Sequence, residues 1–242
     1  MCWPGVKGFW RNCVKADEPS MNRKILCYGD SNTYGYDPRS YLGGRYPETV
    51  RWTALLEQQD WSVFNAGENG RSIPRREREI DAILHMIQQL KPDIVTVMLG
   101  SNDVLQSPDL PADECADRME YFLKTLLERG PSCEYLLIAP PPMTFGAWVN
   151  DSKTVEVSRA LREYYKVVAR RLDIYFADSG TWGIDLTFDG VHFSEAAHLN
   201  FARKINQVLK NIKAKTIQEG QVCLADKREK RLQSMTNPER SL

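Results

Sequence analysis

The stretch Lys24-Ile25-Leu26-Cys27-Tyr28-Gly29-Asp30-Ser31-Asn32 decides how this chain folds. A short apolar run comes first, and glycine and polar residues follow it directly. This pattern is typical of a strand that is buried on both faces of a parallel sheet and ends in a tight turn. We therefore expect a strand over residues 24–28, followed by a loop that exposes the Ser31 hydroxyl.

Four further apolar runs follow along the chain, and helical patterns separate them. The five expected strands cover residues 24–28, 61–65, 93–99, 135–139 and 174–177. Apolar residues at three- and four-residue steps predict amphipathic helices over 80–90, 119–126, 155–172 and 194–212. Strands that alternate with helices are typical of a parallel sheet covered on both faces. The sequence therefore predicts an α/β fold with three layers, α/β/α.

Three polar segments lie where the first three expected strands end. They are Gly29-Asp30-Ser31-Asn32, Asn65-Ala66-Gly67-Glu68-Asn69-Gly70 and Gly100-Ser101-Asn102-Asp103. A fourth segment, Asp189-Gly190-Val191-His192, lies in the loop after the fifth strand. Ligands of open α/β sheets bind beyond the carboxyl ends of the strands, so we expect these segments to converge on one rim.

Together the four segments contain the groups that attack on an acyl carbon requires. The Ser31 hydroxyl needs a base to take its proton, and Asp189, three residues before His192, can orient that imidazole. The side-chain amide of Asn102 and backbone amides can stabilise the oxyanion, although Asn102 could instead cap a loop. Each segment alone also describes ordinary turns, but their combination in this order indicates an esterase or acyl hydrolase.

On these residues the chain resembles the SGNH hydrolases, also called GDSL esterases and lipases, over roughly residues 23–212. The resemblance implies a catalytic triad of Ser31, Asp189 and His192. It also implies an oxyanion hole formed by Ser31, Gly70 and Asn102. It supports a flavodoxin-like five-stranded parallel sheet with the strand order 2-1-3-4-5, which would bring the first and third strands together.

Some details of the resemblance bear on single residues. Gly70 is preferred to Gly67 as the oxyanion donor, because the family pattern places the donor five residues after Asn65; Gly67 then serves the turn. The family's usual leucine after the serine is Asn32 here, which could alter the pocket. The stretches over residues 25–31, 51–53 and 98–103 look like bacterial arylesterase and acyltransferase members. Asp30 and Asp103 are expected to accept hydrogen bonds from loop amides.

Substrate preference rests on aromatic and polar residues near the four segments. The expected pocket residues are Asn32, Tyr34, Trp52, Phe145 and Trp182, and further candidates are Tyr36, Trp148 and Phe188. For most of them ordinary loop packing is the competing interpretation. We expect short acyl esters, such as acetyl esters of alcohols, phenols or sugars, to be the substrates.

Two alternative functions stay open. An alcohol could intercept the acyl-enzyme in a dry pocket, which would make the protein an acyltransferase. In the other, the protein is a non-catalytic binding protein whose Ser31 loop cradles phosphate. The sequence disfavours the binding protein, since it has neither Gly-x-Gly-x-x-Gly nor Gly-x-x-x-x-Gly-Lys, and His192 and Asp189 would have no purpose.

Composition limits the remaining possibilities. The chain has 242 residues, of which 42% are hydrophobic, and this is enough for one sizeable core. We expect a single domain over residues 21–213, with an N-terminal extension over 1–20 and a polar C-terminal tail over 214–242. The 32 basic residues balance the 32 acidic ones, which disfavours nucleic acid and acidic membranes as partners. No apolar run is long enough to span a membrane. We expect a cytoplasmic protein with a small-molecule ester as its partner, and a homo-oligomer stays open.

The other reactive side chains are expected to have no catalytic role. The six cysteines, at 2, 13, 27, 115, 133 and 223, show neither close pairs nor metal-ligand spacing, so free thiols are expected. His85 and His198 lie on expected helices and are predicted to be structural. No clustered set of His and carboxylates suggests a metal, and we expect no cofactor.

Overall fold

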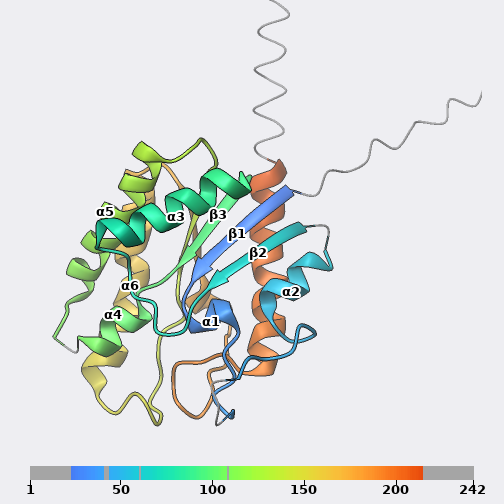
Figure 1. Ribbon diagram of the computed structural model, residues 1–242. Coiled ribbons are helices and arrows are strands. Elements are labelled where there is room, and N and C mark those ends of the chain that lie inside the picture. Colours follow the sequence, from blue (N-terminus) through green and yellow to red (C-terminus); the bar gives the residue numbers. More distant parts are fainter. Residues whose placement is uncertain (1–22, 41–43, 60, 108, 215–242) are drawn as a thin grey trace, which may run out of the picture.

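The computed structural model describes residues 23–40, 44–59, 61–107 and 109–214 (Figure 1). The expected extension over 1–20 and all of the expected tail except residue 214 lie outside the described residues. Within the described part of the chain, no helix has the length and apolar character needed to cross a bilayer.

Five parallel strands form one sheet, as the sequence predicts. They are β1 (Arg23–Gly29), β2 (Trp61–Gly67), β3 (Ile94–Met98), β4 (Glu134–Ala139) and β5 (Tyr175–Asp178). Their order is β2-β1-β3-β4-β5, and every neighbouring pair is parallel. The expected α/β class and strand order are therefore confirmed. Observed strand ends lie within two residues of the expected ones.

All four expected helices are present, and shorter ones join them. The labelled helices are α1 (Ser31–Tyr34), α2 (Trp52–Glu57), α3 (Glu77–Leu90), α4 (Ser101–Gln106), α5 (Ala112–Arg129), α6 (Ser152–Arg171) and the 3₁₀ turn η1 (Ser179–Thr181). A further helix covers residues 195–214 and is drawn in orange in Figure 1. The short helices α1, α2 and α4 escaped the sequence analysis, because four to six residues are too few to show a helical period.

The helices cover the two faces of the sheet and make three layers (Figure 1). Successive strand residues point to opposite faces. In β1, Leu26 and Tyr28 pack in the cluster that includes residues of α3, α5 and α6. Ile25 and Cys27 pack in a second cluster, with residues of α2 and of the helix over 195–214. The apolar residues of β1 therefore contribute to the core on both faces of the sheet.

The two edge strands correct one expectation. Burial on both faces holds for most of β1 and for all of β3, but β2 alternates between buried and exposed positions, and Phe64 is 47% exposed. In β5, three of the four residues are only half-buried. Each of these strands has a neighbour on one side only, so their apolar composition did not imply full burial.

Candidate active site

The loop after β1 places Ser31 at the start of a short helix. Asp30 caps α1, because its Oδ1 accepts a hydrogen bond from the backbone N–H of Asn32 at 3.0 Å. A side chain at position 29 could not fit, since its Cβ would lie 2.1 Å from the Thr33 hydroxyl oxygen. The chain therefore turns directly from the strand into the helix, and Ser31 lies at the carboxyl end of β1.

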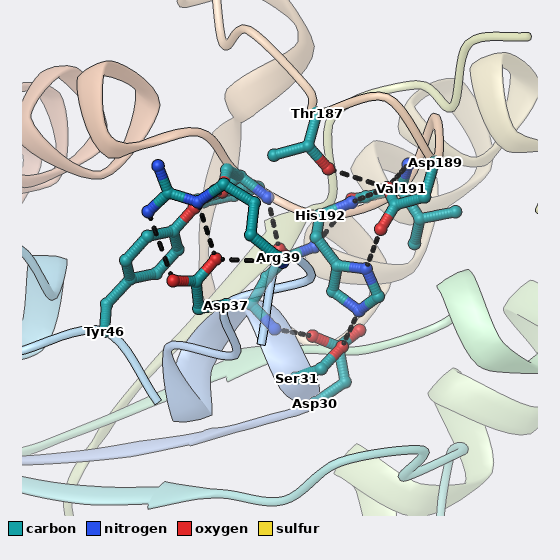
Figure 2. Close-up of polar contacts among 11 residues, drawn as sticks. Asp30, Ser31, Asp37, Arg39, Tyr46, Thr187, Asp189, Val191 and His192 are labelled. Carbon is teal, nitrogen blue, oxygen red and sulfur yellow. Dashed lines mark hydrogen bonds and ion pairs between the residues drawn. The ribbon is translucent and has the colours of Figure 1, made fainter. Parts of the chain in front are cut away.

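Ser31, His192 and Asp189 form a chain of hydrogen bonds (Figure 2). The Ser31 Oγ lies 3.0 Å from His192 Nε2, and His192 Nδ1 lies 2.6 Å from Asp189 Oδ2. All three side chains are buried. The structure thus brings together, across about 160 residues of sequence, the three residues for which the sequence predicts a triad. Such a chain can pass the serine proton to the imidazole.

Asp189 is held by donors on both carboxylate oxygens. Its Oδ1 accepts from the Thr187 hydroxyl at 2.9 Å and from the backbone N–H groups of Val191 and His192 at 2.9 and 3.0 Å (Figure 2). Burial by itself would raise the pKa of Asp189. The hydrogen bonds from the His192 ring and from the two backbone amides outweigh burial and lower that pKa below its ordinary value. Asp189 is therefore a charged acceptor that orients the His192 ring.

Gly70 lies on the loop after β2, and Asn102 lies in the first turn of α4, after β3. Gly70 has φ +74°, a conformation that glycine adopts without strain. Neither the Gly70 N–H nor the Ser31 N–H donates to another described residue. The Asn102 side chain donates to the Arg71 carbonyl at 3.0 Å, so it does tie a loop, and its amide has a second hydrogen to offer.

Two other aspartates at these loops hold the backbone, as expected. Besides the Asp30 cap, Asp103 Oδ2 accepts from the backbone N–H of Ile73 at 2.9 Å, and Arg118 lies 3.5 Å from the other carboxylate oxygen. Burial raises the pKa of Asp30 to about 6 and raises that of Asp103 as well, against the hydrogen bonds that they accept. Gly67 lies where β2 meets α1, and a Cβ there would lie 2.1 Å from the Tyr34 nitrogen. Gly67 therefore allows the backbone of β2 to approach the backbone of α1 closely, besides any role in the turn.

Three of the expected pocket residues are held by contacts within the fold. Trp52 is 1% exposed and packs against Phe201 in the second core cluster, and the half-buried Trp182 also contacts the Phe201 ring. Asn32 is buried and bonds to the backbone of Val191 and Phe193. The role of these three side chains in the pocket stays a prediction, although the contacts of Trp52 and Trp182 with Phe201 favour ordinary packing, the competing interpretation.

Other candidates do lie at the rim. The Tyr36 ring lies 4.6 Å and the Trp148 ring 4.9 Å from the His192 ring, measured between centroids. Phe145 and Phe188 are 65% and 64% exposed, on the loops over 144–149 and 187–190 that hydrogen bonds join. The Tyr34 ring stacks under the guanidinium of Arg45 at 4.5 Å.

The other two histidines lie on helices, and three of the six cysteines lie in the part of the chain that the structure describes. His85 is exposed on α3, and His198 is buried on the helix over 195–214. Cys27, Cys115 and Cys133 are free thiols, as expected, whereas Cys2, Cys13 and Cys223 lie outside the described residues. In the part of the chain that the structure describes, no group of three His, Cys, Asp or Glu could hold a metal ion.

Two contacts at the site escaped the sequence analysis. Thr187 bonds to Asp189, and Arg71 joins the loop after β2 to its neighbours. A threonine two residues before an aspartate is a common turn pattern, and an arginine after a glycine has no special signature. Only the fold shows what either side chain contacts.

Comparisons with known proteins show which family and fold this chain shares. A family model described as "GDSL-like Lipase/Acylhydrolase family" matches residues 27–199. A solved carbohydrate acetylesterase family member from Sinorhizobium meliloti is 27% identical, with a TM-score of 0.68, and the match covers 78% of this chain and 97% of that one. The aryl esterase of M. smegmatis is 24% identical, with a TM-score of 0.68 and coverage of 78% and 99%, and shows likeness of fold. No curated protein gives a significant match.

Proposed function

Because the chain belongs to the GDSL-like lipase/acylhydrolase family, and is thus a carboxylic ester hydrolase, we propose that it hydrolyses short-chain acyl esters through an acyl-enzyme on Ser31. The hydrogen-bond chain from Asp189 through His192 to Ser31 is the observation that carries this proposal. In a protein that only binds a ligand, such a buried and oriented imidazole would have no task.

In the first half of the reaction, the Ser31 oxygen attacks the acyl carbon while its proton moves to His192 Nε2. Asp189, whose low pKa keeps it charged, stabilises the imidazolium that forms. The negative oxygen of the tetrahedral intermediate is stabilised by the N–H groups of Ser31 and Gly70 and by the Asn102 amide. Collapse of the intermediate expels the alcohol, which takes the proton from His192.

Water completes the reaction by the same route in reverse. It attacks the acyl carbon while His192 takes its proton, and the carboxylic acid leaves as the proton returns to Ser31. These steps need neither a metal nor a cofactor. The half-buried Tyr36 ring and the exposed Trp148 ring lie on the His192 side, where the alcohol leaves, and support esters of small alcohols, phenols or sugars as substrates. The solved acetylesterase relative supports a short acyl group.

The test is hydrolysis of p-nitrophenyl esters of increasing chain length by the wild-type protein and by Ser31→Ala, with fluorophosphonate labelling followed by mass spectrometry. We expect the wild-type protein to cleave the acetyl ester fastest and to be labelled on Ser31. The variant should be unlabelled and lose at least about 10³-fold in kcat, because the attacking oxygen is gone. A folded wild-type protein that neither cleaves nor labels would contradict the proposal.

Acyl transfer is a variant of the same chemistry. If an alcohol added to the assay yields a new ester alongside the acid, the acyl-enzyme also serves as an acyl donor. The cytoplasmic location expected from the sequence stays a prediction.

A further inference from the structure

We propose that Arg71 is a positioning residue that holds the three oxyanion donors in one arrangement. The inference rests on the proposed function, because it assigns a role within that oxyanion hole. Arg71 follows Gly70 directly in the chain. It contacts the ends of β1 and β2 and the start of α4, next to the segments that supply Ser31, Gly70 and Asn102.

The side chain of Arg71 joins the ends of β1 and β2. Its Nη1 donates to the carbonyl of Gly29 at 2.9 Å and also to the carbonyl of Ala66. Its Nη2 donates to the Glu68 carboxylate at 2.5 Å. The guanidinium lies over the Tyr28 ring, 4.2 Å from its centroid. One planar group therefore links the last residues before the Ser31 loop to the start of the Gly70 loop.

The backbone of Arg71 holds the third loop. Its carbonyl accepts the hydrogen bond of the Asn102 side chain at 3.0 Å. The Arg71 carbonyl thus determines which way the Asn102 amide points, and hence where its second hydrogen is directed. A displacement of Arg71 would move the Gly70 N–H, through the shared backbone, and the Asn102 amide together.

The Gly70 backbone has little other support. Nothing lies within 4 Å of the place where a Cβ of Gly70 would be, and its positive φ belongs to a residue with wide conformational freedom. The Gly70 carbonyl is bonded only weakly to the exposed Gln106, at 3.4 Å. Because side-chain packing does not fix this residue, the anchored Arg71 beside it is the main restraint on the direction of its N–H.

Lysine could not replace these contacts. The Arg71 side chain is 17% exposed, so its hydrogen bonds are largely shielded from water. The guanidinium is a rigid fork that donates to several acceptors at once, whereas an ammonium group is a single point charge on a flexible stem. Arg71→Lys should therefore keep the charge opposite Glu68 and lose the simultaneous contacts to Gly29 and Ala66.

The first measurement is kcat and KM of Arg71→Lys on p-nitrophenyl acetate. We expect kcat to fall about 10- to 100-fold, since oxyanion donors act in the transition state and small misplacements are costly there. KM should stay within about threefold, because the ground state uses these donors little. Arg171→Lys is the matched control. Arg171 is the last residue of α6 and bonds to Glu120 on α5, so its replacement should leave kcat unchanged.

A double-mutant cycle separates positioning from general stabilisation. If Arg71 acts through the oxyanion hole, Arg71→Lys should lower kcat much less in an Asn102→Ala background than in the wild-type background. Additive losses would indicate an effect unrelated to the oxyanion hole and would overturn the inference.

Methylguanidinium provides a second readout. Arg71 and Gly70 line a cavity of about 420 Å³, so this small cation can enter where Arg71→Ala leaves space. Added methylguanidinium should raise kcat of Arg71→Ala at least about tenfold toward the wild-type value. If Arg71→Ala does not fold, the Arg71→Lys measurements decide. If the wild-type protein is active and Arg71→Lys has the same kcat, the role of Arg71 is overturned and the proposed function stands. If the folded wild-type protein is not labelled on Ser31, the proposed function itself is overturned.

Discussion

At the scale of the residue, Asp189 shows how a single carboxylate is made into a fixed orienting group. One oxygen accepts three hydrogen bonds from its own loop, and this leaves the other oxygen to face the His192 ring. Because backbone amides hold the Asp189 carboxylate in one rotamer, the His192 ring faces an acceptor in a fixed position. The tautomer of His192 that can accept the Ser31 proton follows from this contact.

We predict that Asp189→Asn lowers kcat about 10⁴-fold while the protein stays folded. The asparagine oxygen can keep the bonds to the backbone amides, so its amino group then faces His192 Nδ1 as a donor. The imidazole would carry its hydrogen on Nε2 and could not accept from Ser31. The measurement is kcat on p-nitrophenyl acetate with a thermal unfolding curve as control, and a loss below tenfold would contradict this role.

At the scale of the element, α2 and the helix over 195–214 are joined by His198. The His198 Nδ1 accepts from the backbone N–H of Trp52, at the start of α2, at 3.4 Å. The ring is buried between Tyr46 and Phe193, and its Nε2 makes no hydrogen bond to a described residue. Burial, together with the positive charge of Arg51, lowers the pKa of His198 to about 3. The neutral ring therefore fits this junction, and a charged one does not.

This junction predicts a stability that depends on pH. Between about pH 6.5 and pH 3 the unfolded chain protonates His198 and the folded protein does not, so the free energy of unfolding falls as pH is lowered, by up to about 1.4 kcal/mol per unit. His198→Asn can keep an acceptor for the Trp52 N–H and does not titrate. We expect a flatter dependence in this range from urea unfolding at several pH values. Parallel curves for the two proteins would contradict the prediction.

At the scale of the whole molecule, Asn32 joins two parts of the chain that lie about 160 residues apart. Its side-chain amide donates to the Val191 carbonyl at 3.1 Å, and its Oδ1 accepts from the Phe193 N–H at 2.9 Å. His192 lies between those two residues. Asn32, which replaces the usual leucine of the family, thus joins the loop of His192 to the segment that carries Ser31.

We predict that Asn32→Leu lowers kcat about tenfold and destabilises the fold by about 2 kcal/mol, because the backbone groups on both sides of His192 lose their partners. Asn200→Leu is the control: Asn200 bonds to the carbonyls of Trp182 and Gly183, away from Ser31. It should lower the thermal midpoint and leave kcat unchanged. Equal kcat in the two variants would show that the Asn32 bonds do not position His192.

The order of elements, the parallel sheet and the three residues of the expected triad could all be predicted from the sequence. Strands and long helices follow from local apolar patterns, as in residues 24–28 and 155–172, and the polar segments stand out because they interrupt those patterns. The short helices α1 and α4, which begin at Ser31 and Ser101, have no such pattern. The helix α1 follows from the Asp30 cap, whereas α4 begins after the tight turn at Gly100, which has φ +118° and provides no side-chain cap.

Which side chains meet at the site depends on tertiary contacts. Trp52 lies in the core with Trp182 packed against it, Tyr36 and Trp148 lie beside His192, and Arg71 joins the ends of β1 and β2 to α4. Sequence position does not carry this information, since each contact depends on the direction in which a side chain leaves its backbone and on elements far away in the chain. Local physics determines the elements of this protein, and long-range packing determines what its loops present to a substrate.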